Sequence, residues 1–310
     1  MRVALSNTLE QVKVEKAISH AFLHLFALTG GPSDEDGLKL LEDALEEGAF
    51  RLEELGESGS VPELRVINGG ARPVLVLEGD ELIGAKQNRV VNSSVLVAAE
   101  SELVLPVSCV ERGRWSRRSR SFSSGKATPH LSLRHLKSRS VHDSLKRGRG
   151  HRSDQGAVWE EVDRLAYLYA SPSPTDALQD TRAGLSERLT AFDDFANRLP
   201  ENTRGVVVAI GNRPVALEIL AGPRSFAKVF PKLLTGYALE ALEHKGDGEP
   251  PDGSTAERFV SKVASVRQEQ HPTVGEGTDV RFEEENLLGY ALVADGNVLH
   301  AAAFAESFAG

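Results

Sequence analysis

Two stretches in the C-terminal half of the chain constrain the fold most strongly, because each contains two apolar runs separated by a short turn sequence. Residues 205–220 are apolar on both sides of Gly-Asn-Arg-Pro at 211–214, and residues 287–304 are apolar on both sides of Asp-Gly-Asn at 295–297. Apolar runs joined by turns rich in Gly, Asn and Pro are typical of β-hairpins. The chain is therefore predicted to build antiparallel sheet from strands that are neighbours in the sequence.

The N-terminal half shows the same pattern. Residues 64–77 contain two apolar runs on either side of Asn68-Gly69-Gly70, which predicts a third hairpin. The runs at 90–98 and 102–110 repeat the pattern, and the aromatic-rich run 20–28 ends at a Gly-Gly-Pro turn, as a strand would. The first 115 residues are therefore predicted to be mainly β-structure.

Helices are predicted where apolar residues recur at intervals of three and four. Five segments show this spacing: 38–47, 157–169, 183–198, 226–242 and 256–266. Hairpins combined with separate helices, without regular strand–helix–strand alternation, favour an α+β fold. We predict an antiparallel β-rich N-terminal half, with helices and β-hairpins in the C-terminal half.

Composition divides the chain into three segments. Residues 1–115 form the β-rich part, residues 116–153 form a basic, Ser-rich loop, and residues 154–310 form an α+β part. A chain of 310 residues is long enough to bury a substantial core. We expect the segments to pack as one compact unit.

Charge is distributed very unevenly along the chain. Residues 112–152 hold 13 Lys or Arg residues and a single acid, Asp143, which gives this basic segment a charge of +12. The whole chain carries −9, so the remainder carries −21. Two interpretations stay open: the basic segment packs against the acidic surface of the same chain, or it contributes to an anion-binding site.

Several features indicate a cytoplasmic protein without a membrane segment. The single cysteine, Cys109, excludes an intrachain disulfide, and the first residues lack the profile of a signal peptide. No apolar run approaches the roughly 18 to 20 residues that span a bilayer. The oligomeric state is left open.

A cluster of four polar residues, Lys86-Gln87-Asn88-Arg89, interrupts the apolar runs of the N-terminal half. Ordering four long polar side chains costs conformational entropy, so a fold that fixes them gains either a hydrogen-bond network or a ligand. In the first case the nearby acids pair with the two cations, and the amides bond neighbouring strands. In the second, the cations bind phosphate and the amides bind a sugar or a base.

The sequence around this cluster resembles a known family. The two longest matching motifs are EGDELIGAKQNRVVNSS at 78–94 and PVSCVERGRW at 106–115. Shorter agreements follow in the expected order: DQGAVW at 154–159, GVVVAIG at 205–211 and FPKLL at 230–234. Together they resemble the ARG and Rhodanese-Phosphatase-superfamily-associated Protein family. Its name links it to ADP-ribosylglycohydrolases, so the resemblance implies a role in ADP-ribose or nucleotide-sugar metabolism, without an established activity.

With the resemblance, we predict recognition or processing of an ADP-ribose-like or other phosphorylated nucleotide ligand. The predicted ligand-binding residues are Lys86, Gln87, Asn88, Arg89, Glu111, Arg112, Arg114 and Trp115. Glu81 is the candidate catalytic base, although the sequence leaves open whether the protein is an enzyme. No phosphate-binding or dinucleotide-binding glycine motif is present, and no cofactor is predicted.

Cysteine and histidine chemistry is not favoured. Alternation of apolar residues places Cys109 on the apolar face of a strand, where a thiol behaves as a small hydrophobic group. On one strand, His20 and His24 would lie about 13 Å apart, too far to share a metal ion. No metal site is predicted.

The alternative function is a non-catalytic interaction module. The basic segment would then dock nucleic acid or an acidic protein. It offers few aromatic side chains for stacking on bases, Trp115 and Phe122, so nucleic acid is the less favoured partner.

Overall fold

The protein is described by a computed structural model that covers residues 4–33, 35–192, 194–244 and 248–305. The chain folds as two compact units. The first comprises Met1–Asp36, Ala191–Thr273 and Gly277–Gly310, and the second comprises Gly37–Thr190 and Val274–Glu276. The first unit thus combines the two ends of the chain, an arrangement that the sequence did not predict.

The first unit is built on one antiparallel sheet of eight strands, in the order β1-β2-β12-β13-β17-β16-β15-β14. Its strands are β1 (Val12–His20), β2 (Leu23–Gly30), β12 (Thr203–Ile210), β13 (Arg213–Leu220), β14 (Glu269–Pro272), β15 (Thr278–Glu284), β16 (Leu287–Ala294) and β17 (Asn297–Ala305). The pairs β12–β13 and β16–β17 are the two hairpins predicted in the C-terminal half. Both predictions are confirmed, because each turn joins strands that are neighbours in the sheet.

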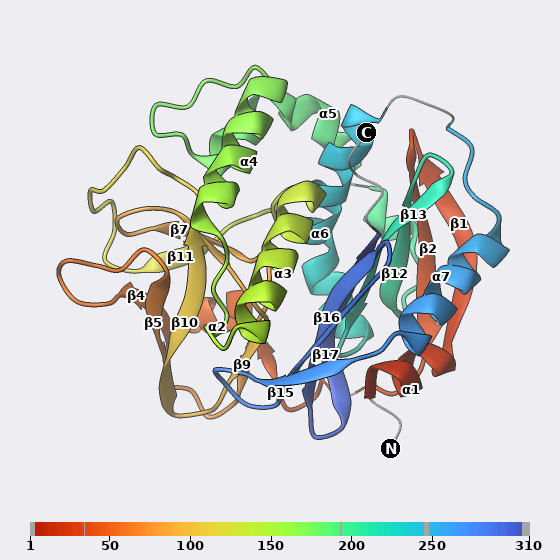
Figure 1. Ribbon diagram of the computed structural model, residues 1–310, viewed down its shortest axis with the longest axis horizontal. Coiled ribbons are helices and arrows are strands. Elements are labelled where there is room, and N and C mark those ends of the chain that lie inside the picture. Colours follow the sequence, from red (N-terminus) through yellow and green to blue (C-terminus); the bar gives the residue numbers. More distant parts are fainter. Residues whose placement is uncertain (1–3, 34, 193, 245–247, 306–310) are drawn as a thin grey trace. The chain divides into compact units, whose positions relative to one another are not determined.

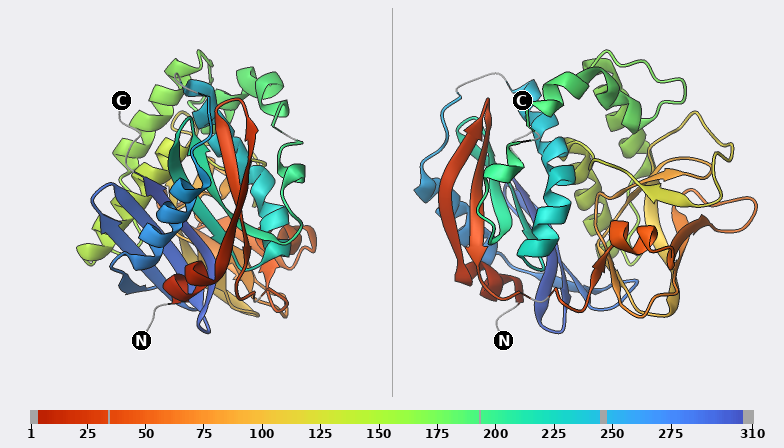
Figure 2. Two further views of the ribbon diagram at one scale, coloured as in Figure 1. Left: turned by 90° about the vertical axis from the view of Figure 1, so that its right-hand side faces the viewer. Right: turned by 180° about the vertical axis from the view of Figure 1, so that it is seen from behind.

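Helices pack on both faces of this sheet, as Figure 1 shows. One face is covered by α1 (Ala4–Gln11) and α7 (Gly253–Ser265), and the other by α6 (Pro223–Glu243). Apolar side chains of α1 and α7, such as Leu5 and Val260, form a buried core with Val207 and Leu217 of the sheet. Figure 2 shows α1, α7 and the sheet from two further directions. The short 3-10 helix η2 (Ala196–Arg198) completes this unit.

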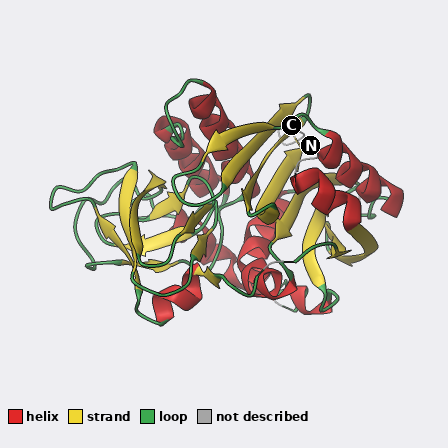
Figure 3. Ribbon diagram, turned by 90° about the horizontal axis from the view of Figure 1, so that it is seen from below, coloured by secondary structure: helices red, strands yellow, loops and turns green. Residues whose placement is uncertain are grey.

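The second unit contains a six-stranded sheet, β11-β7-β8-β10-β5-β4, and a three-stranded sheet, β3-β6-β9. The strands are β3 (Lys39–Leu40), β4 (Phe50–Glu54), β5 (Glu63–Asn68), β6 (Val74–Val76), β7 (Glu81–Gly84), β8 (Arg89–Val91), β9 (Val95–Val97), β10 (Ser101–Cys109) and β11 (Phe122–Ser124). The helices are α2 (Leu41–Glu46), α3 (Leu131–Lys146), α4 (Gln155–Leu168), the 3-10 helix η1 (Leu178–Leu185) and α5 (Ser186–Thr190). All named strand pairs are antiparallel except β3–β6. The predicted α+β class and the strand-rich N-terminal half are confirmed, and Figure 3 shows the mixture of strands and helices.

The predicted hairpin around Asn68-Gly69-Gly70 is wrong. Strand β5 pairs with β4 and β10, whereas β6 pairs with β3 and β9. The Asn68 side-chain amide donates to the carbonyl oxygens of Arg72 and Ala98, at 3.0 and 2.8 Å. These bonds fix an open connection in place of a two-residue turn, so the two runs enter different sheets.

The sequence predicts a loop at 116–153 with a short helix around 131–136. The structure has a helix there, α3, but it extends to 16 residues, and the segment also contains strand β11. The buried face of α3 is difficult to recognise in the sequence because it includes charged residues as well as apolar ones. Leu133 and Val141 are fully buried, but so are Arg134 and Lys137, whose charges are bonded to a carboxylate described below.

Two further predictions need correction. The single helix expected at 183–198 is divided among the short helices η1, α5 and η2, and the run 20–28 is interrupted by a turn between β1 and β2. Helix α1 at the start of the chain was missed. Among the described residues, no helix combines the length and the apolar character needed to cross a bilayer.

Candidate functional site

The predicted polar cluster lies in the second unit, at the connection between strands β7 and β8. Lys86, Gln87 and Asn88 occupy the turn, and Arg89 is the first residue of β8. The turn bends sharply because Gly84 has a φ of +128° and Ala85 a φ of +37°. A side chain at Gly84 would also lie 2.5 Å from Ser119 Oγ, so glycine is required there.

Glu111 and Arg114 hold this turn in place. The Arg114 guanidinium donates to both carboxylate oxygens of Glu111, at 2.7 and 2.6 Å. It also donates to the carbonyl oxygen of Ala85 at 2.7 Å, while Glu111 accepts from the Asn88 backbone N–H at 3.0 Å. Thr175 Oγ1 donates to the same carboxylate at 2.8 Å. Every group in this network is therefore matched.

The net effect on Glu111 is a stabilised carboxylate. Burial alone raises the pKa of Glu111, but hydrogen bonds from Arg114, from the Asn88 N–H and from Thr175 outweigh it, and the pKa lies below its usual value. The carboxylate is ionised near neutral pH. It serves as the anchor of the turn.

Two other predicted or neighbouring acids are also paired. Both oxygens of Glu81, the candidate base, accept bonds of 2.6 Å from Arg182. Glu78 accepts a bond of 3.1 Å from Arg134 of α3, and Lys137 Nζ lies 3.6 Å from the same carboxylate. Nothing in the sequence connects Arg182 with Glu81, which are 101 residues apart. The i, i+3 spacing of Arg134 and Lys137 was the signal that two cations share one helix face.

Arg89 has different surroundings. Its side chain is fully buried, and its Nη1 donates to Gln87 Oε1 at 3.1 Å and to the Asn88 carbonyl oxygen at 3.4 Å. Among the residues that the structure describes, Nε and Nη2 of Arg89 have no hydrogen-bond partner. The nearest carboxylate oxygen, Glu54 Oε1, is 4.0 Å from Nη2. Burial lowers the pKa of Arg89 and neighbouring carboxylates oppose the shift, as expected for a cation that the chain satisfies only in part.

Trp115 lies between this buried cation and the surface. Its indole is 48% exposed, with Arg89 Cζ 5.8 Å and Lys86 Nζ 5.2 Å from the ring centroid. Lys86 Nζ donates to the carbonyl oxygens of Glu57 and Ser58, at 2.6 and 2.7 Å. We call Glu54, Gly59, Lys86, Arg89 and Trp115 the Arg89 cluster.

The loop that contains Gly59 packs closely against the other residues of the Arg89 cluster. Gly59 has a φ of +74°, and a Cβ there would lie 3.1 to 3.4 Å from Glu54 Oε2, Lys86 Cδ and Trp115 Cζ2. A glycine is needed for both conformation and space. The sequence reasoning missed Glu54 and Gly59, which are far from the polar cluster along the chain.

The predicted residue Arg112 lies on the surface and forms ion pairs with Asp163 and Asp176, at 3.1 and 3.5 Å. In the same basic segment, Arg117 lies 3.7 Å from Glu57 and Arg118 lies 3.9 Å from Glu111. Much of the basic segment thus pairs with acids of its own unit.

The prediction for Cys109 is confirmed. The thiol is fully buried, and burial raises its pKa despite the nearby Arg89. Cys109 Sγ donates to Gln87 Oε1 at 3.2 Å, so the thiol takes part in positioning the amide.

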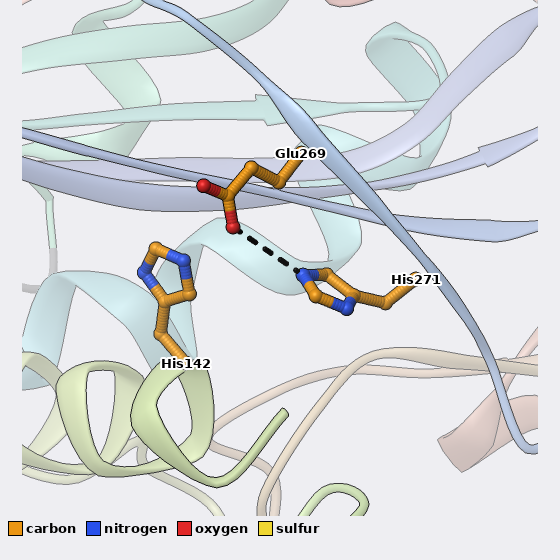
Figure 4. Close-up of side chains that lie close together, drawn as sticks. All are labelled: His142, Glu269 and His271. Atoms are coloured by element: carbon orange, nitrogen blue, oxygen red, sulfur yellow. Dashed lines mark ion pairs between the residues drawn. The ribbon is translucent and has the colours of Figure 1, made fainter. Parts of the chain in front are cut away.

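Histidine geometry adds little to the site. His20 and His24 lie on different strands, β1 and β2. On β14, His271 Nε2 is 3.8 Å from Glu269 Oε2, as Figure 4 shows. Two side chains with this spacing form an ion pair when the imidazole is protonated.

A sequence model of the ARG and Rhodanese-Phosphatase-superfamily-associated Protein domain matches residues 11–304, which include most of both units. The chain belongs to this family. The resemblance predicted from the motifs at 78–94 and 106–115 is therefore confirmed. Neither the curated proteins nor the solved structures contain a match to the chain.

The two long family motifs lie next to each other in the structure. The 78–94 motif supplies the turn with Arg89, and the 106–115 motif supplies Glu111, Arg114 and Trp115. The structure brings the predicted residues Lys86, Arg89 and Trp115 together in the Arg89 cluster. Gln87, Asn88, Glu111 and Arg114 form the framework behind it, and Glu81 lies in a separate pair with Arg182.

Proposed function

We propose that this member of the ARG and Rhodanese-Phosphatase-superfamily-associated Protein domain family recognises a phosphorylated nucleotide ligand, of the ADP-ribose type, at the Arg89 cluster. One observation carries the proposal: Arg89 is fully buried, yet two of its guanidinium nitrogens find no hydrogen-bond partner within the described chain. A buried cation that is satisfied only in part is costly unless it serves a ligand.

The positively charged side chains of the Arg89 cluster are suited to bind a phosphate. A guanidinium offers parallel N–H groups to phosphate oxygens, and Lys86 adds a second positive charge beside the same indole. Among the described residues, Lys86 Nζ donates hydrogen bonds only to backbone carbonyl oxygens in the loop of Gly59, and it would exchange these neutral acceptors for an anion. Arg117 and Arg118 extend the positive charge across the surface next to Trp115.

Trp115 would provide the stacking surface for a base. Half-exposed tryptophan is well suited to this because its indole presents an apolar face to an aromatic ligand. Arg89 lies within 5.8 Å of the ring, so a phosphate reaches the guanidinium only when the indole shifts. Ligand binding and a movement of Trp115 are thus coupled in this proposal.

The contacts favour recognition over catalysis by Glu81. Both oxygens of Glu81 already accept hydrogen bonds from Arg182, so neither oxygen is free to take a proton from a ligand. Processing of the ligand with Glu81 as the base would first require Arg182 to leave it. Gln87 and Asn88, which could read a sugar or a base, are engaged in the framework and would act by positioning Arg89.

The alternative is an interaction module that docks nucleic acid or an acidic protein through the basic segment. The observation that favours it is a run of exposed cations at the C-terminal end of α3, with Lys146, Arg147 and Arg149 on the surface. Phosphate contacts of this kind give affinity that falls steeply with salt.

Thermal unfolding with added ligands, run beside salt titrations of DNA and RNA binding, separates the two functions. The proposal expects ADP-ribose and AMP to raise the unfolding temperature while adenosine, which lacks phosphate, does not. Salt-sensitive binding of DNA or RNA without stabilisation by ADP-ribose would support the interaction module. An unchanged unfolding temperature with every phosphorylated nucleotide would overturn the proposal.

A triple variant, Arg117→Ala, Arg118→Ala and Arg120→Ala, then tests the surface charge. The proposal expects weaker binding of ADP-ribose by the triple variant, because the surface cations draw the phosphates toward Trp115. Equal binding by the wild-type protein and the triple variant would remove the basic segment from the site.

A further inference from the structure

The first unit contains a second arginine whose guanidinium is buried and only partly bonded. Arg204, near the start of β12, is 2% exposed, and its Nη2 donates to the carbonyl oxygens of Leu220 and Ala221 at 2.8 and 3.4 Å. Its Nε and Nη1 have no hydrogen-bond partner among the described residues. Arg204 is therefore another cation that the described chain satisfies incompletely.

A strand irregularity directs this side chain. The pairing of β12 with β2 shifts between Thr203 and Gly205, so Arg204 is the extra residue of a bulge. Bulges redirect side chains and are frequent beside functional sites. Gly205 follows because a Cβ there would overlap the Glu218 carbonyl oxygen.

The guanidinium is directed toward the beginning of α6. This helix of 21 residues starts at Pro223, directly after the two carbonyl groups that Arg204 binds. Its N-cap, Gly222, has no side chain to bond the first N–H groups of the helix. The N–H groups of the first turn have no carbonyl partner within the helix, and together with the helix dipole they make such an end favourable for an anion.

A carboxylate of the same unit lies at this helix end. Glu35 Oε1 accepts from the Arg224 N–H at 3.1 Å, and Oε2 accepts from the Ser225 N–H at 2.7 Å. A Cβ at Gly222 would overlap Ser33 Oγ and would lie 2.5 Å from the Glu35 carboxyl carbon. The glycine therefore leaves the space that the carboxylate fills.

Glu35 satisfies the helix end but not the arginine. Within the described residues, no ion pair joins Arg204 to Glu35 and no hydrogen bond does so, although the carboxylate is near enough to influence the charge. Burial lowers the pKa of Arg204 and the charge of Glu35 opposes this effect, which leaves a pKa of about 10. The guanidinium is therefore charged near neutral pH. A carboxylate has two oxygens, and those of Glu35 accept from the Arg224 and Ser225 N–H groups. A phosphate has further oxygens that can also accept from the Arg204 guanidinium.

We propose that Arg204 and the N-terminus of α6 form a phosphate-binding site of the first unit, in which the Glu35 carboxylate stands in for the phosphate. A phosphate at this position accepts from the Arg224 and Ser225 N–H groups and from Nε and Nη1 of Arg204. Glu35 moves out to solvent when the phosphate enters, so it limits the affinity of the site. This site includes none of the residues of the Arg89 cluster, so the inference does not depend on the proposed function.

The test is a pair of charge-matched variants, Glu35→Gln and Asp36→Asn, titrated calorimetrically with inorganic phosphate and with pyrophosphate. Each removes one negative charge from adjacent positions, but only Glu35 bonds the helix end; Asp36 is fully exposed and 3.4 Å from Arg224 Nη2. Removal of the competing carboxylate is expected to raise phosphate affinity about tenfold over the wild-type protein, and Asp36→Asn is expected to raise it about twofold or less.

The location of the bound phosphate is checked by amide NMR of the Glu35→Gln protein. The Arg224 and Ser225 amide signals should shift on titration, and a further Arg204→Lys substitution should weaken binding about tenfold because lysine cannot present two parallel donors. Equal phosphate affinity in the Glu35→Gln and Asp36→Asn proteins, or unchanged Arg224 and Ser225 signals at saturation, would overturn the site. The NMR result decides even if Arg204→Lys fails to fold.

Discussion

Two buried arginines of the second unit, Arg114 and Arg89, have opposite surroundings. Arg114 donates to both oxygens of Glu111 and to several carbonyl oxygens, so each of its N–H groups has a partner. Among the described residues, Arg89 forms hydrogen bonds through Nη1 alone, and its nearest carboxylate oxygen is 4.0 Å away. The comparison teaches that burial of a cation does not define its role: Arg114 holds a turn, whereas Arg89 has two nitrogens that, in our proposal, bind a ligand.

The largest expected effect is on the Arg114 side of the comparison. Glu111→Gln leaves the buried Arg114 charge without its counter-ion, and breaking a buried pair in this way costs about 3 to 5 kcal/mol of the free energy of unfolding. Urea denaturation followed by circular dichroism measures the loss.

The matched control for this substitution is Glu102→Gln, which breaks an exposed pair of 2.5 Å with Arg65. An exposed pair contributes about 0 to 1 kcal/mol, so the control should unfold almost as the wild type does. Similar losses for the two variants would show that Glu111 does not anchor the turn.

A smaller change in stability is expected on the Arg89 side. Arg89→Met removes a charge whose burial is poorly compensated and fills a similar volume, so the free energy of unfolding should stay within about 1 kcal/mol of the wild-type value. The same denaturation experiment measures it. A loss as large as that of Glu111→Gln would mean that Arg89 is a structural cation like Arg114, and the comparison would fail.

The smallest expected effect concerns the thiol that contacts Gln87. Burial raises the pKa of Cys109, so its contribution to stability is present below the pKa of the unfolded thiol and is lost as the pH rises through the folded value. At about pH 8 the native protein should react with a thiol reagent only as fast as it opens, because the thiolate is the reactive form. Rapid labelling of native protein, at the rate of the urea-unfolded chain, would contradict this.

The sequence predicted the features that depend on local pattern. The hairpins β12–β13 and β16–β17 followed from apolar runs around turn residues, and the buried position of Cys109 followed from alternation along β10.

The features that the sequence did not reveal depend on residues distant along the chain. Arg182 pairs with Glu81 from 101 positions away, and Glu54 approaches Arg89 from another strand. The full length of helix α3 was missed because Arg134 and Lys137 look solvent-exposed until their partner Glu78 is known. Pairing of buried charges is a tertiary property, and a single sequence carries no signal for it.

The most direct test of the account is the affinity for ADP-ribose, measured by calorimetry on the wild-type, Arg89→Met and Arg149→Met proteins. Arg149 is an exposed arginine near the other end of the basic segment and is not part of the triple variant, so the control removes an equal charge from the surface. The account predicts that the wild-type protein binds, that Arg89→Met weakens binding at least about tenfold, and that Arg149→Met changes it about twofold or less. Equal affinity in the wild-type and Arg89→Met proteins, or no binding by the wild type, would contradict it.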